Sequence, residues 1–458
     1  MAMRFIASAA AAMLLLGAPV AQAQLAIGHD IQLLLDDHVI ASRTGLSKVQ
    51  ERPGTGQIVL RADAPWEQRV FYPTVMRLPN GVFRMYYNAG LISDPTFNII
   101  SMAESRDGVH FRRTPADNIV FRDAHGPSFA YDPRDGAAPW RMVYFGPNNG
   151  MGAATSRDGT NFDPVASNPI LINKADTQQS VVWDPAVRKW VMFTRYWEKP
   201  ADGRAAWPWF KNEIRSVARS ESSDFIHWSP LEVVIRRGRE DPALSDFYGL
   251  QVTMRHGVMI GLLWTSDWDD TSGRLGRQRA QLVVSRDHGR TWSRVDPETM
   301  FFDLGAPGSF DSKIVWPSSI VTAGDRELIY YLAANRDHGA DPIPTFPRDK
   351  YSIGVRTIAR DRFVALVAGD TEGRLSTRQV IVPSMPELRL NAKVQPGGYL
   401  RVWATRADGR VLARGVAPAG DRISAAIVWQ QGSLRSLTGQ LVTIHFAFRN
   451  AALYSFRL

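Results

Sequence analysis

Four carboxylates stand at similar positions along the chain, each a few residues upstream of a predicted β-strand. They are Glu67, Asp176, Asp246 and Asp311. Two carboxyl groups can divide acid–base catalysis between them, because one donates a proton while the other acts as base or nucleophile. If several lie close together, like-charge repulsion raises the pKa of at least one and keeps it protonated near neutral pH. We therefore take all four as candidate catalytic residues, with Glu67 and Asp176 as the preferred pair.

Aromatic and basic side chains surround these positions in the predicted loops. The candidate substrate-binding residues are Arg195, Trp197, Arg215, Tyr248, Trp268 and His338. Flat aromatic rings stack on sugar faces, while Arg, Asp and Glu bind hydroxyl groups, so the mixture suits a carbohydrate. Arg195 and Arg215 could pair with the carboxylates or bind a carboxylate of the substrate. The alternative explanation, that the tryptophans seal seams between sheets, stays open.

Other chemistries leave weaker signals in the sequence. The chain has no cysteine, which excludes thiol catalysis and thiolate metal sites. No Gly-x-Ser-x-Gly elbow is present, and the nine histidines are scattered rather than clustered as zinc ligands would be. We expect no cofactor, although a structural calcium ion is compatible with the sequence.

A short Ser-x-Asp pattern returns along the chain and sets the spacing of its elements. Its copies occupy residues 105–108, 156–159, 222–224 and 285–289, with a degraded copy at 359–361. The aspartates are 51, 66, 63 and 74 residues apart, about one four-stranded propeller blade each. In such a turn the Asp accepts hydrogen bonds from backbone N–H groups, and Gly permits positive φ. These aspartates therefore indicate the fold and are not candidates for catalysis.

Each repeat predicts several short strands joined by turns. In the first, strands are expected at 72–78, 82–87 and 99–104, and no convincing amphipathic helix appears anywhere. Beyond residue 380, alternating strands continue without the Ser-x-Asp pattern, which is typical of a β-sandwich. We predict an all-β fold, a five-bladed β-propeller followed by a C-terminal β-sandwich. A propeller would gather the start of every inner strand, and with it the four carboxylates, around one central pit.

The predicted domain order is a signal peptide at 1–23, the propeller at 24–380 and the sandwich at 381–458. Arg4, an apolar stretch at 5–16 and the small-residue site Ala21-Gln22-Ala23 are typical of a secretory leader. We therefore expect export to the periplasm or the extracellular space, with no membrane span. Removing the leader lowers the formal net charge from +9 to +8, because Arg4 is its one charged residue.

A basic surface suits an acidic partner such as an acidic glycan, although it could simply keep the protein soluble. We expect no nucleic-acid partner, because the chain lacks a concentrated basic tract. The mature protein is expected to be a monomer with a carbohydrate substrate.

The segment Ser285-x-Asp287-x-Gly289-x-Thr291-Trp292 resembles the Asp-box of sialidase-type propellers. Together with the five repeats and the C-terminal strands, it resembles the five-bladed propeller glycosidases of glycoside hydrolase families 32, 43 and 68. The last residues, 441–458, are similar to the tail of secreted bacterial proteins described as glycosyl hydrolase family 32-like. The resemblance covers nearly the whole mature chain and implies a secreted glycoside hydrolase acting on a polysaccharide or oligosaccharide.

The catalytic roles of those families do not transfer to this chain by motif. The families use an Asp, an Asp and a Glu from the first three blades, but the chain lacks the Asn-Asp-Pro-Asn and Arg-Asp-Pro motifs that carry them. Two alternatives stay open, a non-catalytic carbohydrate-binding propeller and a sialidase-like exo-glycosidase. The second would need an arginine cluster and a nucleophilic tyrosine, for which Arg195, Arg215, Arg336 and Tyr248 are available.

Overall fold

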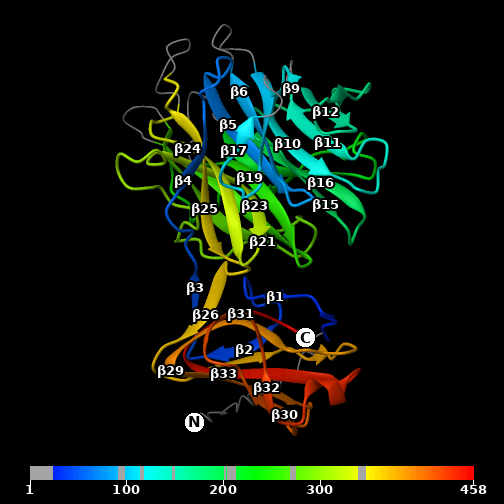
Figure 1. The fold of residues 1–458 in the computed structure, drawn as a ribbon, viewed down its shortest axis with the longest axis vertical. Coiled ribbons are helices and arrows are strands. Elements are labelled where there is room, and N and C mark those ends of the chain that lie inside the picture. The colour runs from blue at the N-terminus through cyan, green and yellow to red at the C-terminus, as the bar shows by residue number, and fades with distance from the viewer. Residues whose placement is uncertain are drawn as a thin grey trace, which may run out of the picture.

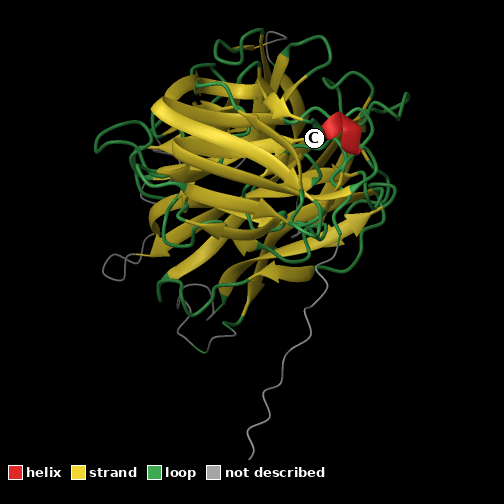
Figure 2. Cartoon of the chain, turned by 90° about the horizontal axis from the view of Figure 1, so that it is seen from below, coloured by secondary structure: helices red, strands yellow, loops and turns green. Residues whose placement is uncertain are grey.

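The computed structural model describes residues 24–90, 98–113, 118–146, 150–200, 203, 213–268, 275–338 and 347–458. The predicted leader therefore lies outside the described residues. Nearly all regular structure is β, with one short 3-10 helix, η3 (Leu434–Leu437), in the described part of the chain. No described helix is long and apolar enough to cross a membrane. The predicted all-β class is confirmed, and Figure 1 shows the strands in a larger upper group and a smaller lower group, while Figure 2 shows how strands dominate the chain.

A four-stranded antiparallel path recurs five times in the upper group. The first path is β5 (Arg69–Arg77), β6 (Phe83–Gly90), β7 (Asn98–Ser105) and β8 (Arg112–Arg113), and the second is β10 (His125–Tyr131), β11 (Trp140–Phe145), β12 (Gly150–Ser156) and β13 (Asp163–Pro164). The third path is β15 (Ser180–Asp184), β16 (Lys189–Glu198), β17 (Ile214–Ser222) and β18 (Glu232–Ile235), and the fourth is β19 (Ser245–Arg255), β20 (Val258–Trp268), β21 (Leu275–Ser285) and β22 (Ser293–Arg294). The fifth path is β23 (Ile314–Ala323), β24 (Arg326–Ala334) and β25 (Tyr351–Ala359) with β4 (Gln57–Arg61). Two further strands, β9 (Ile119–Arg122) and β14 (Leu171–Ile172), extend the first two sheets.

The fifth path is completed by a strand from the start of the chain. β4 pairs antiparallel with β25, and Arg61 lies opposite Ser352. One parallel bridge, between Gln278 and Ile314, connects the fourth and fifth paths. The backbone hydrogen bonds between β4 and β25 therefore hold the beginning of the chain against its last repeat.

The Ser-x-Asp turns follow strands of their own path and also contact a neighbouring path. In the first turn Asp107 accepts backbone hydrogen bonds from Val109 and His110, both 2.9 Å long. The Tyr330 hydroxyl donates to the Gly108 carbonyl at 2.7 Å, which ties β24 to this turn. Gly108 has φ +79°, and a Cβ there would meet the Leu328 side chain at 2.6 Å, so glycine is needed for this contact.

The lower group is built around two long strands, β29 (Arg389–Thr405) and β33 (Leu441–Arg457), which pair antiparallel. Its path runs β2-β27-β33-β29-β30-β32, and β1, β3, β26, β28 and β31 attach to it. The remaining bounds are β1 (Gln32–Leu33), β2 (Ile40–Thr44), β3 (Ser47–Gln50), β26 (Val364–Ala368), β27 (Gly373–Thr377), β28 (Val380–Ile381), β30 (Val411–Val416), β31 (Gly420–Ala426) and β32 (Val428–Gln431).

One apolar core holds this lower group together. Leu390, Val402, Phe446 and Leu453 are all buried in it. β1 pairs with β33, β2 with β27 and β3 with β26, so strands from the first fifty residues complete the C-terminal sheet. The pairing thus combines segments from both sides of residue 380, and the predicted boundaries at 24–380 and 381–458 stay a prediction.

Candidate functional site

The first strands of four paths contain a break in register near their beginnings. The shifts lie between Phe71 and Thr74 in β5, between His125 and Ser128 in β10, between Phe247 and Gly249 in β19, and between Pro317 and Ser319 in β23. A bulge adds one residue to a strand and re-aims the side chains around it. Tyr72 lies inside one of these bulges with φ +52°, a strained backbone conformation for an aromatic residue.

Aromatic rings from these strands and from β20 form a stacked cluster. The ring of Trp316 stacks on Tyr248 at 4.4 Å between centroids, on Trp264 at 5.3 Å and on Tyr72 at 5.7 Å. His125 meets the Tyr72 ring edge-on at 5.3 Å. The cluster therefore joins residues from the first, second, fourth and fifth paths.

Two carboxylates and two arginines adjoin this cluster. The Asp176 Oδ1 lies 3.1 Å from His125 Nε2, and its Oδ2 lies 3.8 Å from Arg195 Nη2. The Asp246 Oδ2 lies 3.2 Å from Arg215 Nη1. The Asp246–Arg215 pair thus joins the fourth path to the third, and Asp176 connects His125 of the second path with Arg195 of the third.

The arginines also face the aromatic residues predicted to bind substrate. The guanidinium of Arg195 lies 5.1 Å from the Tyr248 ring centroid, and that of Arg215 lies 4.6 Å from it. Both approach the Trp197 ring as well, at 5.4 and 5.0 Å. Such cation–π contacts hold the two cations and the two rings in one group.

His338 completes the cluster, with its ring beside those of Tyr248 and Trp316. Its Nε2 lies 3.4 Å from the Tyr248 hydroxyl, and the two rings meet edge-on at 5.6 Å. Burial, with the neighbouring charges of Arg215 and Lys350, lowers the pKa of His338 to about 3. The imidazole is therefore neutral at physiological pH and acts here as a polar, uncharged neighbour.

The two carboxylates differ in exposure and in pKa. The Asp246 side chain is 3% exposed, and burial raises its pKa even though Arg215 and Arg195 oppose the change. The Asp176 side chain is 66% exposed. Partial burial opposes its ionisation, but the hydrogen bond with His125 and the charge of Arg195 outweigh this and hold its pKa well below the ordinary value. One environment favours a protonated acid and the other an ionised carboxylate.

Glu67 and Asp311 lie in separate buried ion pairs. Glu67 accepts hydrogen bonds from the Tyr87 hydroxyl at 2.6 Å and from Arg113 Nε at 3.0 Å. Asp311 accepts from the Tyr331 hydroxyl at 2.8 Å and is paired with Arg356. Within the described residues, neither makes a hydrogen bond or ion pair with Asp176 or Asp246.

The structure therefore gathers part of the predicted site. Asp176, Asp246, Arg195, Trp197, Arg215, Tyr248 and His338 lie in one network of contacts. The side chain of Trp268 lies outside the described residues, as do residues 204–212 of the loop after β16. The preferred pair of Glu67 with Asp176 is not joined by any contact in the described part.

Sequence reasoning assigned no catalytic or substrate-binding role to Tyr72, His125, Trp264 or Trp316. A signal was present for three of the bulges. Tyr72-Pro73, Gly126-Pro127 and Trp316-Pro317 place a proline inside β5, β10 and β23, and proline within a strand marks a bulge or an edge.

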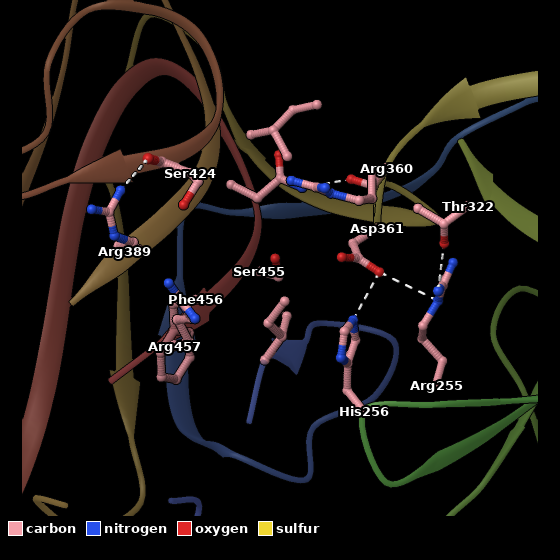
Figure 3. Close-up of a pocket in the computed structure, with 13 residues that line it drawn as sticks. Arg255, His256, Thr322, Arg360, Asp361, Arg389, Ser424, Ser455, Phe456 and Arg457 are labelled. Atoms are coloured by element: carbon pink, nitrogen blue, oxygen red, sulfur yellow. Dashed lines mark hydrogen bonds and ion pairs between the residues drawn. The ribbon is translucent and has the colours of Figure 1, made fainter. Parts of the chain in front are cut away.

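Two cavities bear on the choice of site. One, of about 400 Å³, is lined by Asn98, Asp123, His125 and Asp176 among others, beside the network described above. A second, of about 390 Å³, lies where the β19–β20 turn meets the C-terminal sheet, and Figure 3 shows His256 and Arg255 facing Asp361 there. None of the predicted site residues lines the second cavity.

The described residues contain no group of three or more His, Asp or Glu side chains placed to hold a metal ion. A structural calcium ion stays a prediction.

No protein-family model matches the sequence, and no curated protein matches it either. Among solved structures, a glycoside hydrolase is similar at 15% identity and a TM-score of 0.48, over 66% of this chain and 90% of the other. A glycosyl hydrolase from Bacteroides ovatus is similar at 17% identity and a TM-score of 0.46, over 73% and 98%. A fructofuranosidase from Schwanniomyces occidentalis is similar at 11% identity and a TM-score of 0.45, over 89% and 98%.

These three similar structures are described as glycoside hydrolases or a fructofuranosidase. Similarity this weak carries no argument about the reaction, which has to be inferred from the site itself.

Proposed function

We propose that the protein is a glycoside hydrolase whose five four-stranded paths form a propeller and whose C-terminal strands form a sandwich. The observation that carries this proposal is the placement of two carboxylates in opposite environments within one aromatic-lined network, with Asp176 exposed beside His125 and Asp246 buried beside Arg215. Glycoside hydrolysis needs one carboxyl group that donates a proton and one that attacks or activates water. Such pairs are found where environments push two pKa values apart.

In this proposal Asp246 is the general acid and Asp176 is the base or nucleophile. Burial shifts Asp246 toward its protonated form, while the hydrogen bond with His125 and the charge of Arg195 favour the ionised form of Asp176. The partly exposed ring of Trp197 provides a stacking surface for a sugar unit, while the buried ring of Tyr248 holds Arg195 and Arg215 in place. The buried charges of Arg195 and Arg215, together with the basic character of the chain, favour an anionic substrate.

Hydrolysis of a polysaccharide panel, measured as release of reducing sugar, tests this proposal. Asp176→Asn and Asp246→Asn should each lower kcat by about a thousandfold or more, because each removes one half of the acid–base pair. Asp370→Asn changes an exposed carboxylate of the C-terminal sheet and serves as the control. Full activity in both site variants would show that the chemistry lies elsewhere.

A non-catalytic carbohydrate-binding protein is the second candidate. It is favoured by the contacts themselves, since Asp246 already lies 3.2 Å from Arg215 and Asp176 already lies 3.1 Å from His125 without a ligand. If glycans from the panel bind but none is cleaved, and both Asn variants bind as tightly as the parent, this candidate replaces the first. A sialidase-like reaction through Tyr248 is less favoured, because the partner of its hydroxyl is His338 and not a glutamate.

We also propose that the chain acts outside the cytoplasm as a monomer, after residues 1–23 are removed. Sequencing of the exported protein should then begin at Gln24. Light scattering should give the mass of one mature chain.

A further inference from the structure

The C-terminal sheet carries a polar hollow on its outer face that the proposed reaction does not use. Along β29, Val402 faces the apolar core while Arg401 and Trp403 alternate onto the opposite face. A cavity of about 600 Å³ lies against that face. Its volume is within the range of sites that hold small ligands. In Figure 1 three of the strands that form it, β33, β29 and β30, belong to the lower group, and the fourth, β27, pairs with β33.

The register of these strands explains why the face is hollowed. Ala447 of β33 lies between Arg374 of β27 and Arg401 of β29, its partners on either side. A methyl group flanked by two long side chains leaves a depression in the sheet surface. In the next row, Trp403 lies opposite Arg414 of β30, so the tryptophan borders the same hollow.

The charge of the hollow is positive. Arg374, Arg401 and Arg414 line it, together with one carboxylate, Glu372. Glu372 accepts a hydrogen bond from Arg374 at 2.8 Å and lies 4.0 Å from Arg401. Arg414 makes no ion pair within the described part of the chain. Arginine forks match carboxylate and sulfate groups with two parallel hydrogen bonds, so the excess cations favour an anionic ligand.

Trp403 gives the hollow a fixed apolar wall. Its ring stacks on His445 with centroids 5.0 Å apart and planes 11° from parallel. His445 is held by hydrogen bonds with Ser376 at 2.8 Å and Thr405 at 2.9 Å, and burial lowers its pKa, so it stays neutral. A tryptophan braced in this way, on the side of the sheet away from the core, offers a rigid surface for a sugar ring.

We propose that the hollow formed by Arg374, Arg401, Trp403, Arg414 and Ala447 binds an acidic sugar unit of a glycan. The sugar ring stacks on Trp403 while its acidic group, a carboxylate or a sulfate ester, is held by the arginines. This site is separate from the proposed hydrolytic site and stands whether or not the protein is an enzyme. It would hold a polymer against the C-terminal sheet.

Calorimetric titration of the full mature chain tests the proposal. The chain carries Asp176→Asn and Asp246→Asn so that no probe is consumed. A galacturonate oligomer and a sulfated galactan oligomer distinguish the two acidic groups, and a cello-oligomer is the neutral probe. We expect one acidic probe to bind at the hollow, and the neutral probe to bind it at least tenfold more weakly.

Variants of the outer face then locate the binding. Arg401→Glu, Arg414→Glu and Trp403→Ala should each weaken binding tenfold or more, and Ala447→Phe should block it by filling the floor of the hollow. Arg422→Ala removes an exposed arginine of β31 that does not line the cavity and should change nothing. Circular dichroism and melting confirm that each variant is folded.

Several results would overturn the proposal. They are failure of both acidic probes to bind at millimolar concentration, an equal effect of Arg422→Ala, or binding that survives both glutamate substitutions. A dimer in solution that Trp403→Ala dissociates would instead make this face an interface between copies of the chain. Because binding is measured on a chain without the proposed catalytic carboxylates, its failure is distinct from failure of the hydrolysis assay.

Discussion

At the scale of single residues, the site depends on how two similar side chains acquire different proton affinities. Asp246 and Asp176 are the same residue type, but one is enclosed beside Arg215 and the other is open beside His125. If Asp176 must be ionised and Asp246 protonated for reaction, activity falls at low pH as Asp176 gains a proton. It falls at higher pH as Asp246 loses one. The acidic and alkaline limbs of the pH–activity profile can therefore be shifted separately by substitutions near Asp176 and near Asp246.

His125→Ala should move the acidic limb of the kcat/KM profile to higher pH. The hydrogen bond and charge of His125 help to lower the pKa of Asp176, so removing them lets that pKa rise. A shift of about one pH unit corresponds to the loss of one such interaction. The alkaline limb should stay in place, and a shift of both limbs together would contradict the assignment.

Arg215→Met should move the other limb. Arg215 opposes the burial that raises the pKa of Asp246, so its loss raises that pKa further and the alkaline limb moves to higher pH. The KM should rise too, because Arg215 also faces Trp197 and Tyr248. Arg236→Met, which alters an exposed arginine paired with Glu198, is the control and should leave the alkaline limb unmoved.

At the scale of the elements, the bulges decide which side chains reach the site. The turns and repeated strands could be predicted because their signals are local, in the Ser-x-Asp spacing and in alternating apolar residues. A bulge reverses that alternation. Counting residues upstream of each strand therefore predicted equivalent positions for Glu67, Asp311 and Asp176, although only Asp176 lies in the site. In the structure Glu67 is enclosed by Tyr87 and Arg113, a pairing between residues far apart in sequence that no local pattern reveals.

Gly126→Ala tests the bulge in β10. Gly126 has φ +56°, and a Cβ there would lie 1.8 Å from the Thr177 carbonyl oxygen, next in sequence to Asp176. The substitution must displace that segment, and the backbone strain alone costs about 1–3 kcal/mol. We expect a lower melting temperature and a large loss of hydrolysis. Gly136→Ala, at an exposed glycine where an added Cβ would meet nothing within 4 Å, should alter neither.

At the scale of the whole molecule, long-range pairing was the part that the sequence could not predict. The recurrence of five similar segments was visible in the spacing, and the structure shows five four-stranded paths. The contribution of β4 to the fifth path could not be seen in the sequence, because β4 and β25 are joined by backbone hydrogen bonds, as at Arg61 and Ser352, that any residues could make. The same holds for β1, β2 and β3, whose partners lie more than 300 residues away.

A buried ion pair connects the fourth path to the fifth at the end of β19 remote from Asp246. Glu327 of β24 is fully buried and is paired with Arg255 of β19, while Thr322 donates to Glu327 at 2.9 Å. Arg255 also lies 3.6 Å from Asp361, at the cavity that faces the C-terminal sheet. Arg255 is nine positions after Asp246 on the strand, which corresponds to about 30 Å at roughly 3.3 Å per residue. Changes here should therefore act on stability and not on the chemistry.

Arg255→Met should destabilise the protein by about 3–5 kcal/mol, because it leaves the charge of Glu327 buried without its partner. Burial already raises the pKa of Glu327, and loss of Arg255 would raise it further. The deficit should therefore shrink as the pH is lowered and Glu327 becomes protonated. Adding Glu327→Gln should restore much of the loss, since a neutral amide needs no cation. Denaturant unfolding at several pH values measures these effects, and kcat/KM at low temperature should match that of the parent. A constant deficit across pH, or no rescue by the second substitution, would show that Arg255 contributes packing and not charge.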